Sequence, residues 1–431
     1  MPTQANLKSQ IKALKKTKGA ISSQFKTAKE NPSLLAQLKT QMQAISSQIA
    51  ELETQYKAQI SNPNSSTDVE NNAPCFPSQF TAPEQDLNAP FIIETLTQEQ
   101  WPRWQHFCQQ ALATSLCHET TLYAAIEQAF GHKTDILVAI CDGEIVGGLP
   151  LTKLSSRLFG TFLVSTPYFN YGGPLTSYVN VFEALIKHSK QLLDGHKASH
   201  AEVRTTVANI DLPFADKKAS MILALPKTAE ELDAKVGSKV RAQVNKANEH
   251  NPSVAFGHHD LLDDFYKVFA RNMRDLGTPV YSKQWFATLL DQLQYNATII
   301  VAYVNNKPVG TAFLTGHRDM LEVPWASTIK SANAMNINMW MYRQILGFAI
   351  KKGFMYFDFG RSTIDAGTYK FKKQWGAQPV AHYWYYASKN GNDIAQTNPD
   401  NPKFKLLIAI WKRLPIWFAN LIGPRVIKNI P

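Results

Sequence analysis

The chain has 431 residues, enough for two or three domains, and 44% of them are hydrophobic, which is ordinary for a globular protein. Its formal net charge of +11 favours anionic partners such as phosphates, nucleic acid or a membrane surface. The four cysteines lack metal-ligand spacing, the N-terminus is polar, and no stretch reaches the roughly 18 apolar residues of a membrane span. These features argue against a disulfide scaffold and a membrane-spanning protein, and they predict a cytoplasmic protein with reduced thiols.

The first 60 residues have a periodicity of their own. Apolar residues from Leu35 to Tyr56 are spaced alternately three and four apart, as in a coiled-coil seam. Residues 7–28 repeat the alternation with one polar interruption, and Pro32 separates the two runs. We therefore expect residues 1–60 to form an antiparallel helical-hairpin coiled coil.

An α/β pattern occurs twice after residues 61–89, which are rich in Asn, Pro and Ser and are expected to form a flexible linker. Residues 136–147 align with residues 299–310, and in both an apolar strand, a two-residue turn and a second strand predict a hairpin. A helical pattern and a further strand follow each hairpin, at 181–193 and 201–204 in the first copy and at 338–352 and 356–361 in the second. The repetition predicts a duplication, with domains at 90–225 and 226–400 and a C-terminal segment at 401–431.

Four segments carry a resemblance to a known family. They are TPYFNYGGP at 166–174, RNMRDLGTPVYSK at 271–283, VPWAS at 323–327, and FDFGRS at 357–362, which continues to GTYKFKKQWG at 367–376. With the repeated order of strands and helices, they resemble the FemAB-like branch of the GNAT acyltransferases, and especially the FemAB-like proteins associated with exosortase/PEP-CTERM systems. This resemblance implies an α/β fold (α+β) of duplicated GNAT-like domains. It also implies transfer of an acyl or aminoacyl group to an amine of a cell-envelope or exopolysaccharide precursor.

Asp358 is the main candidate for catalysis, with Tyr369 as a possible proton shuttle. A carboxylate between two phenylalanines is costly to bury unless it is paired, and Arg361 or Lys372 are suitable partners. Asp358 would either position and deprotonate the acceptor amine or form a structural pair at the strand end. Because no Ser-His-Asp or Cys-His arrangement is evident, we expect direct attack on the acyl donor without a covalent enzyme intermediate.

The candidate binding residues are aromatic, amide and basic side chains beside glycines, which suit a loop that holds phosphates or carboxylates. They are Tyr168, Asn170, Tyr171, Lys239, Arg241, Arg274, Tyr281, Trp325, Arg361, Lys370 and Lys372. A plain turn at 168–173 and a solvated basic face at 361–373 are the structural alternatives. The basic segment 239–246 has the place of a GNAT pyrophosphate loop but lacks its glycines, which weakens a coenzyme A interpretation. No metal and no permanently bound cofactor are expected.

The acyl donor is a co-substrate, either aminoacyl-tRNA or acyl-coenzyme A, and three functions remain open. They are Fem-like transfer, an acyl-coenzyme A-dependent N-acyltransferase, and a non-catalytic GNAT-derived scaffold. The arm at 1–60 is similar to the tRNA-binding arm of seryl-tRNA synthetases. Its nine lysines against three acids suit an electrostatic arm for tRNA, and a plain oligomerisation or spacer coil is the alternative that stays open. Residues 404–430 interleave basic and aromatic side chains, so they either contact the inner face of a membrane peripherally or cap the second domain.

Overall fold

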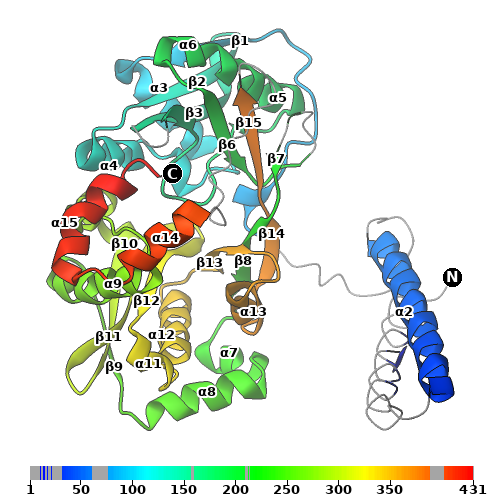
Figure 1. Ribbon diagram of the computed structural model, residues 1–431. Coiled ribbons are helices and arrows are strands. Elements are labelled where there is room, and N and C mark those ends of the chain that lie inside the picture. The colour runs from blue at the N-terminus through cyan, green and yellow to red at the C-terminus, as the bar shows by residue number, and fades with distance from the viewer. Residues whose placement is uncertain are drawn as a thin grey trace. The chain divides into compact units, whose positions relative to one another are not determined.

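The computed structural model describes residues 10, 13, 14, 17, 21, 32–60, 76–156, 160–208, 212, 214–388 and 402–430. It separates into two compact units, Met1–Ala73 and Pro74–Pro431 (Figure 1). No helix in these ranges is long and apolar enough to cross a membrane.

The first unit contains the helix α2 (Pro32–Ile60), which is the second helix of the predicted hairpin. Leu38 of the predicted seam is buried, and it clusters with Met42, Ile45 and the preceding Ile21. This contact is the one that an antiparallel hairpin would make. Most of the first helix, including its lysines, lies outside the described residues, so the hairpin and its charge stay predictions.

The second unit is built on two mixed sheets. The first has the order β1-β2-β3-β4-β6-β15-β7, with β5 paired to β3. Its strands are β1 (Ile92–Leu96), β2 (Thr134–Cys141), β3 (Glu144–Ser156), β4 (Gly160–Val164), β5 (Leu175–Thr176), β6 (His200–Thr205), β7 (Phe214–Ala215) and β15 (Tyr383–Ser388).

The second sheet repeats this order as β9-β10-β11-β12-β13-β8-β14. Its strands are β8 (Lys218–Ala224), β9 (Ser253–Gly257), β10 (Ala297–Val304), β11 (Lys307–His317), β12 (Met320–Thr328), β13 (Tyr356–Thr363) and β14 (Gln378–Ala381). In both sheets a single parallel pairing, β4 with β6 and β12 with β13, lies among antiparallel neighbours. The two sheets therefore share one topology.

The two predicted hairpins are confirmed and match in detail. The turn residues Asp142 and Gly143 of β2–β3, and Asn305 and Asn306 of β10–β11, all have positive φ, which two-residue turns of type I′ require. Each hairpin also shifts register at the same place, after Ala139–Gly147 in one and Ala302–Gly310 in the other. This shared irregularity supports a duplicated domain, as the sequence predicts.

The two sheets exchange one strand. β8 follows β7 in the chain but pairs with β13 in the second sheet, and β15 follows β14 but pairs with β6 in the first. Figure 1 shows orange β15 among the green strands of the first half. The predicted boundary at 225 is therefore wrong for these strands, because β8 leaves the first domain and β15 returns to it.

Helices cover both sheets and join them through a shared core. Those of the first half are α3 (Trp101–Gln110), α4 (Thr120–Phe130), α5 (Val179–His188) and α6 (Leu192–His196). Those of the second are α7 (Ala229–Lys235), α8 (Ser238–Asn248), α9 (Leu262–Leu276), α10 (Lys283–Leu293), α11 (Lys330–Asn333), α12 (Ile337–Lys351) and α13 (Gly367–Lys373). One apolar cluster contains Trp104 and Tyr123 from the first half and Phe265 and Trp285 from the second, so the halves form one body.

The predicted linker is wrong over its last part. Gln79 donates a hydrogen bond to the Tyr171 hydroxyl at 2.8 Å, and Leu87 N donates to Asn180 Oδ1 at 2.9 Å. A 3-10 turn, η1 (Ser78–Phe80), also forms there. Residues 76–89 thus belong to the second unit, while residues 61–75 lie outside the described ranges.

The C-terminal segment forms the two short helices that Pro415 predicts, α14 (Pro402–Trp411) and α15 (Ile416–Ile427). α15 packs on α9, and its Gly423 lies so close to Val280 that a Cβ would meet the Val280 backbone at 2.9 Å. Tyr168 also donates its hydroxyl to the backbone oxygen of Lys428 at 2.6 Å. The segment therefore caps the second unit.

Candidate active site

Two buried carboxylates meet where β12 and β13 part. The parallel register of these strands runs from Met320 opposite Tyr356 to Glu322 opposite Asp358, and it ends there. Asp358 is fully buried and Glu322 is 6% exposed. Partners in a ladder point to the same face of a sheet, so the two carboxylates are neighbours.

Backbone and side-chain donors surround this pair. Asp358 Oδ1 accepts the N–H of Gly360 at 2.7 Å, and Glu322 Oε1 accepts Nδ2 of Asn170 at 3.1 Å. The ammonium of Lys372 donates to the backbone oxygens of Gly360 and Arg361 at 2.8 and 3.1 Å. Asn170 comes from the loop after β4, so both halves of the unit contribute to the site.

Gly360 allows this arrangement because its backbone has φ +75°, where other residues are strained. A Cβ at this position would also lie 3.1 Å from the backbone oxygen of Val323 on β12. The strand bulges there, since the register with β8 shifts between Asp358 and Arg361. The bulge turns the backbone oxygens of Gly360 and Arg361 toward Lys372.

Burial sets the protonation of the pair. Burial, and then the charge of Asp358, raises the pKa of Glu322 above its ordinary value. Burial also raises the pKa of Asp358, although the nearby Lys372 ammonium acts in the opposite direction. Burial lowers the pKa of Lys372 to about 8. Both shifts favour the protonated form of the pair.

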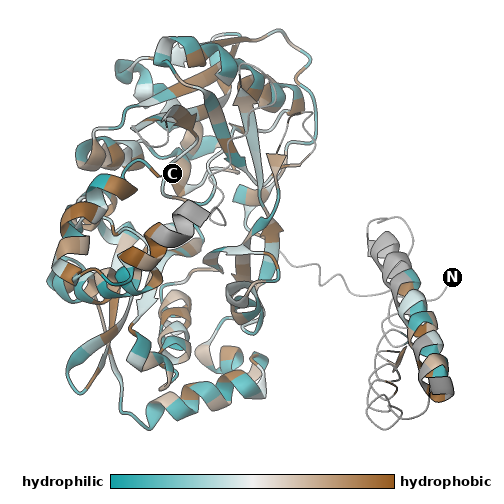
Figure 2. Cartoon of the chain, viewed as in Figure 1, coloured by the Kyte–Doolittle hydropathy of each residue, from teal (hydrophilic) through white to brown (hydrophobic). Residues whose placement is uncertain are grey.

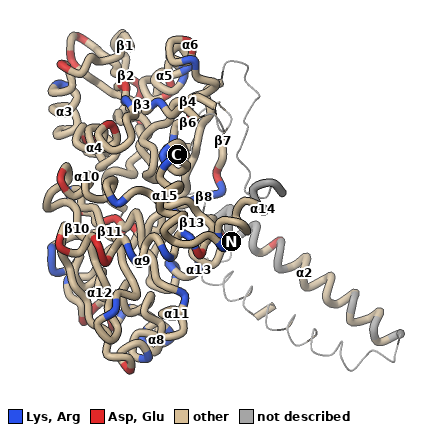
Figure 3. The backbone as a smooth tube through the Cα atoms, turned by 60° about the vertical axis from the view of Figure 1, so that its left-hand side comes forward, with Lys and Arg blue, Asp and Glu red and all other residues tan. Residues whose placement is uncertain are grey.

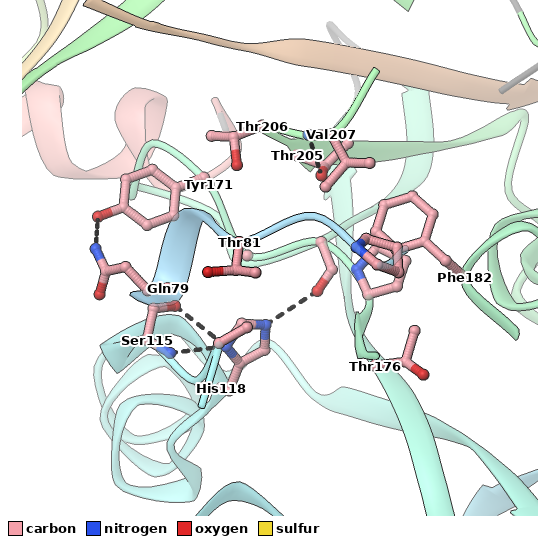
Figure 4. A pocket seen from close by; sticks show the side chains of 15 residues that line it. Gln79, Thr81, Ser115, His118, Tyr171, Thr176, Phe182, Thr205, Thr206 and Val207 are labelled. Atoms are coloured by element: carbon pink, nitrogen blue, oxygen red, sulfur yellow. Dashed lines mark hydrogen bonds between the residues drawn. The ribbon is translucent and has the colours of Figure 1, made fainter. Parts of the chain in front are cut away.

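Glu322 opens onto a small cavity. It lines this cavity together with Gln79, Ser115, Leu116, Cys117, Tyr171, Thr315, His317 and Met320. A second cavity, more polar in its lining, shares Gln79, Ser115 and Tyr171 with the first (Figure 4). His118 lies on its wall, where its ring contacts Ser115 Oγ at 3.1 Å and the Gly173 oxygen at 3.0 Å. The two cavities are therefore neighbours, and Glu322 lines the smaller one.

This arrangement suits proton transfer from an amine. A carboxyl whose pKa is raised toward neutrality is an effective general base. Burial raises the pKa of Tyr171, so its hydroxyl keeps its proton, and the lone pair of that oxygen already accepts from Gln79. Tyr171 is thus a hydrogen-bond donor positioned beside a base.

A second charged cluster lies at the equivalent point of the first sheet. Glu202 ends the parallel register of β4 with β6, opposite Val164, as Asp358 ends that of β13. Its Oε1 accepts Nε of the buried Arg204 at 2.7 Å. The guanidinium carbon of Arg204 lies 4.4 Å from the ring centre of Trp384, and that of Arg361 lies 4.7 Å from it.

The structure brings five of the predicted residues together, namely Asp358, Asn170, Tyr171, Arg361 and Lys372. Tyr369 is elsewhere. It packs in the apolar cluster that holds Phe357 and Phe359, which lie on the face of β13 opposite to Asp358. Helix α13 positions Lys372 for the site and turns Tyr369 into the core.

Three predicted aromatic residues pack next to the site. Tyr281 and Trp325 have ring centres 5.8 Å apart, and Tyr168 lies 5.7 Å from Tyr281. Tyr168 is held by α15 through Lys428, so its role is to join the C-terminal cap to the loop before Asn170. Burial raises the pKa of Tyr281 to about 12, although the neighbouring charges of Arg204 and Arg361 act in the opposite direction.

Four basic residues lie apart from the carboxylates. Lys239 and Arg241 belong to α8, at the lower end of the unit in Figures 1 and 3, and Arg241 donates to the backbone oxygens of Asp233 and Val236. Arg274 pairs with Asp275 at 2.8 Å and donates to the oxygen of Leu414. Lys370 is exposed on α13. The predicted phosphate role of α8 therefore has no support from the geometry of this site.

Sequence reasoning missed Glu322, Glu202, Arg204 and Trp384. Glu322 stands in the apolar run Met320–Val323, just as Asp358 stands between two phenylalanines. An acid in a buried strand indicates a candidate functional residue at both positions, although the sequence prediction includes Asp358 alone. The role of Trp384 had no such signal, because it depends on the strand exchange.

Comparison with known proteins agrees with this architecture. Residues 234–373 match the model of the acetyltransferase (GNAT) domain family. No curated protein matches the chain by sequence. Among solved structures, FemX is 14% identical with a TM-score of 0.53, over 68% of this chain and 97% of that one.

Two further structures are similar at lower TM-scores. A tandem GNAT protein from the clavulanic acid biosynthesis pathway is 11% identical with a TM-score of 0.43, over 70% of this chain and all of that one. L-PGS from Bacillus licheniformis is 12% identical with a TM-score of 0.43, over 75% and 99%. Residues 234–373 thus match a GNAT acetyltransferase domain, and the chain is similar in fold to FemX.

Proposed function

We propose that this protein transfers an acyl or aminoacyl group to an amine and that Glu322 accepts the proton of that amine. The observation that carries the proposal is a buried carboxylate that is paired in register with Asp358 and lines a small cavity. A structural ion pair would need a cation bonded to each acid. Here Lys372 bonds to backbone oxygens, and Glu322 is bonded to an amide.

In the proposed step, the neutral amine nitrogen attacks the carbonyl carbon of an ester or thioester donor. The N–C bond forms as the amine proton passes to Glu322, and the C–O or C–S bond then breaks. The leaving alkoxide or thiolate takes up that proton, so no residue is changed at the end. Tyr171 would donate a hydrogen bond to the oxygen on which negative charge develops.

The resemblance to FemAB-like proteins supports an amine of a cell-envelope or exopolysaccharide precursor as the acceptor. For the donor we favour aminoacyl-tRNA over acyl-coenzyme A, because segment 239–246 lacks the glycines of a pyrophosphate loop and lies away from the carboxylates. We infer that residues 1–60 bind the tRNA electrostatically. A non-catalytic scaffold would have no need for a buried pair of acids with raised pKa values.

The test is transfer from labelled donor pools. The full chain is incubated with labelled aminoacyl-tRNA or acyl-coenzyme A and with amine acceptors, and labelled product is measured. We expect product from aminoacyl-tRNA, and a chain beginning at Pro74 should bind bulk tRNA more weakly than the full chain at low salt. Product from acyl-coenzyme A alone would reject the preferred donor, and no product from either pool would favour the scaffold.

We also infer peripheral contact with an anionic membrane through α15. Trp417 and Leu421 are 69% and 54% exposed, and their spacing of four puts them on one helix face with the exposed Arg425. Figure 2 shows that the C-terminal helices are coloured largely as hydrophobic. Leu407 and Ile410 add exposed apolar surface on α14. Large apolar side chains flanked by basic ones suit the interface of an anionic bilayer.

Flotation with vesicles tests this contact. We expect the protein to float with phosphatidylglycerol-containing vesicles at low salt and to lose this binding by about tenfold in the Trp417→Ser, Leu421→Ser double variant. Ile92→Ser serves as a control, because Ile92 is equally exposed on β1. Equal flotation of the double variant, or no flotation of the native protein, would reject the contact.

A further inference from the structure

Arg361 is an exposed arginine in crowded surroundings. Its guanidinium stacks on Trp384, yet within the described part of the chain no hydrogen bond or ion pair holds it. Its N–H groups are therefore directed to solvent or to a ligand and are available to an anion.

Arg204 brings a second guanidinium to the same indole. It is 2% exposed, and it is fixed through Nε to Glu202 and through one terminal nitrogen to the oxygen of Phe169 at 3.0 Å. Arg204 and Trp384 are direct partners in the β6–β15 ladder, so the sheet itself sets their contact. One arginine is thus rigidly placed, and the other comes from β13 of the second sheet.

The local charge is in excess. Lys218 lies near Arg361, and its ammonium donates to the hydroxyl of Thr363 at 2.6 Å, a neutral partner. Of Arg204, Arg361 and Lys218, only Arg204 is bonded to an acid among the described residues, and that acid is Glu202. Two further polar atoms close to these arginines, Nε1 of Trp384 and Nδ1 of the fully buried His382, have no hydrogen-bond partner among the described residues.

We propose that Arg361 and Arg204, stacked on Trp384, form a binding site for a phosphate group of a substrate. A tetrahedral dianion would balance the excess positive charge, with the exposed Arg361 supplying the N–H donors and the buried Arg204 adding its charge. Arg361 shares the bulge of β13 with the acyl-transfer site, because Lys372 donates to its backbone oxygen. The proposal therefore rests on the proposed function and names the chemistry of its substrate.

A phosphate group at this place has two sources. It belongs either to the acceptor, as in a nucleotide- or lipid-linked precursor, or to the donor, as in tRNA or coenzyme A. Both share the chemistry that the arginines recognise. Uridine diphosphate and coenzyme A therefore serve as separate probes, and the tighter binding one indicates the source.

Isothermal titration of the full chain with inorganic pyrophosphate tests the site. We expect Arg361→Ala to weaken binding by at least about tenfold, Arg361→Lys to retain part of it, and Arg271→Ala, an exposed arginine of α9, to leave it unchanged. Acetate should bind far more weakly than pyrophosphate. Melting temperatures of the variants confirm that each is folded.

Equal pyrophosphate affinity of Arg361→Ala and the native protein would overturn the proposal. Acetate binding as tight as that of pyrophosphate would overturn the phosphate assignment in favour of a carboxylate site. Because binding is measured without turnover, the result does not depend on acyl transfer. Pyrophosphate binding through Arg361 without any transfer product would keep this site and reject the catalytic function, and the reverse pattern would do the opposite.

Discussion

We expect Glu322→Gln to lower kcat/KM for acyl transfer by about 100-fold or more, because it removes the group that accepts the amine proton. The fold should survive, since glutamine is isosteric and removes a buried like charge beside Asp358. Glu249→Gln, an exposed glutamate after α8, is the matched control and should keep full activity. Unchanged activity of Glu322→Gln would show that Glu322 is not the base.

Asp358 acts through Glu322 in this scheme, so its substitution has a different signature. The rate should rise with pH as a proton leaves the pair. Asp358→Asn removes the negative charge that raises the pKa of Glu322, and the rise should therefore move to lower pH. A lower rate with an unmoved pH profile would assign Asp358 a purely structural role.

The same pair has a consequence for stability that follows from the sign of the shifts. A carboxyl whose pKa is raised in the folded state stabilises the protein below its unfolded pKa, and this contribution is lost as pH rises through the folded pKa. Glu322→Gln has no carboxyl at this position, so the variant does not undergo the part of this loss of stability that Glu322 causes. The melting temperature of Glu322→Gln minus that of the native protein should therefore become larger from about pH 5 to about pH 7. This range lies below the titration of Lys372.

Arg204→Ala is expected to lower the free energy of unfolding by about 3–5 kcal/mol, measured by denaturant titration. It leaves the Glu202 carboxylate, whose side chain is 11% exposed, without its ionic partner. It also removes the bond to Phe169 and the contact with Trp384. Stability would then be lost at the junction of β6 and β15.

Two comparisons make this prediction specific. Arg343→Ala breaks an ion pair whose acid, Asp233, is 48% exposed, and we expect a loss of about 1 kcal/mol or less. Adding Glu202→Gln to Arg204→Ala should recover part of the loss, because the buried charge disappears. Strictly additive losses in the double variant would contradict the ion-pair explanation.

Much of the fold was accessible from sequence because its signals are local. The turns Asp142–Gly143 and Asn305–Asn306 sit between apolar strands, and Pro415 separates two helical segments. The strand exchange could not be predicted from the sequence, because β8 and β15 have the patterns of ordinary strands within their own halves. Which sheet each one joins is decided by tertiary pairing, over long separations that periodicity does not report.

The site was predictable to the extent that burying a charge has a cost. Asp358 and Lys372 were identified on that ground, and the structure brings them together. Tyr369 and Lys372 are three apart on one short helix, and only their packing shows that they point to different surroundings. Gln79 stands in a segment of low-complexity composition, so its contact with Tyr171 had no local signal.

The strand exchange also means that the first sheet cannot be completed until β15 has been synthesised. β6 pairs with β15, which the ribosome releases about 180 residues later. At about 5–20 residues per second, the edge of β6 stays open for roughly ten seconds or more during synthesis. An open edge can pair with another nascent chain. The newly made first half therefore carries an unpaired strand edge, and Arg204 and Trp384 come into contact only when translation is nearly finished.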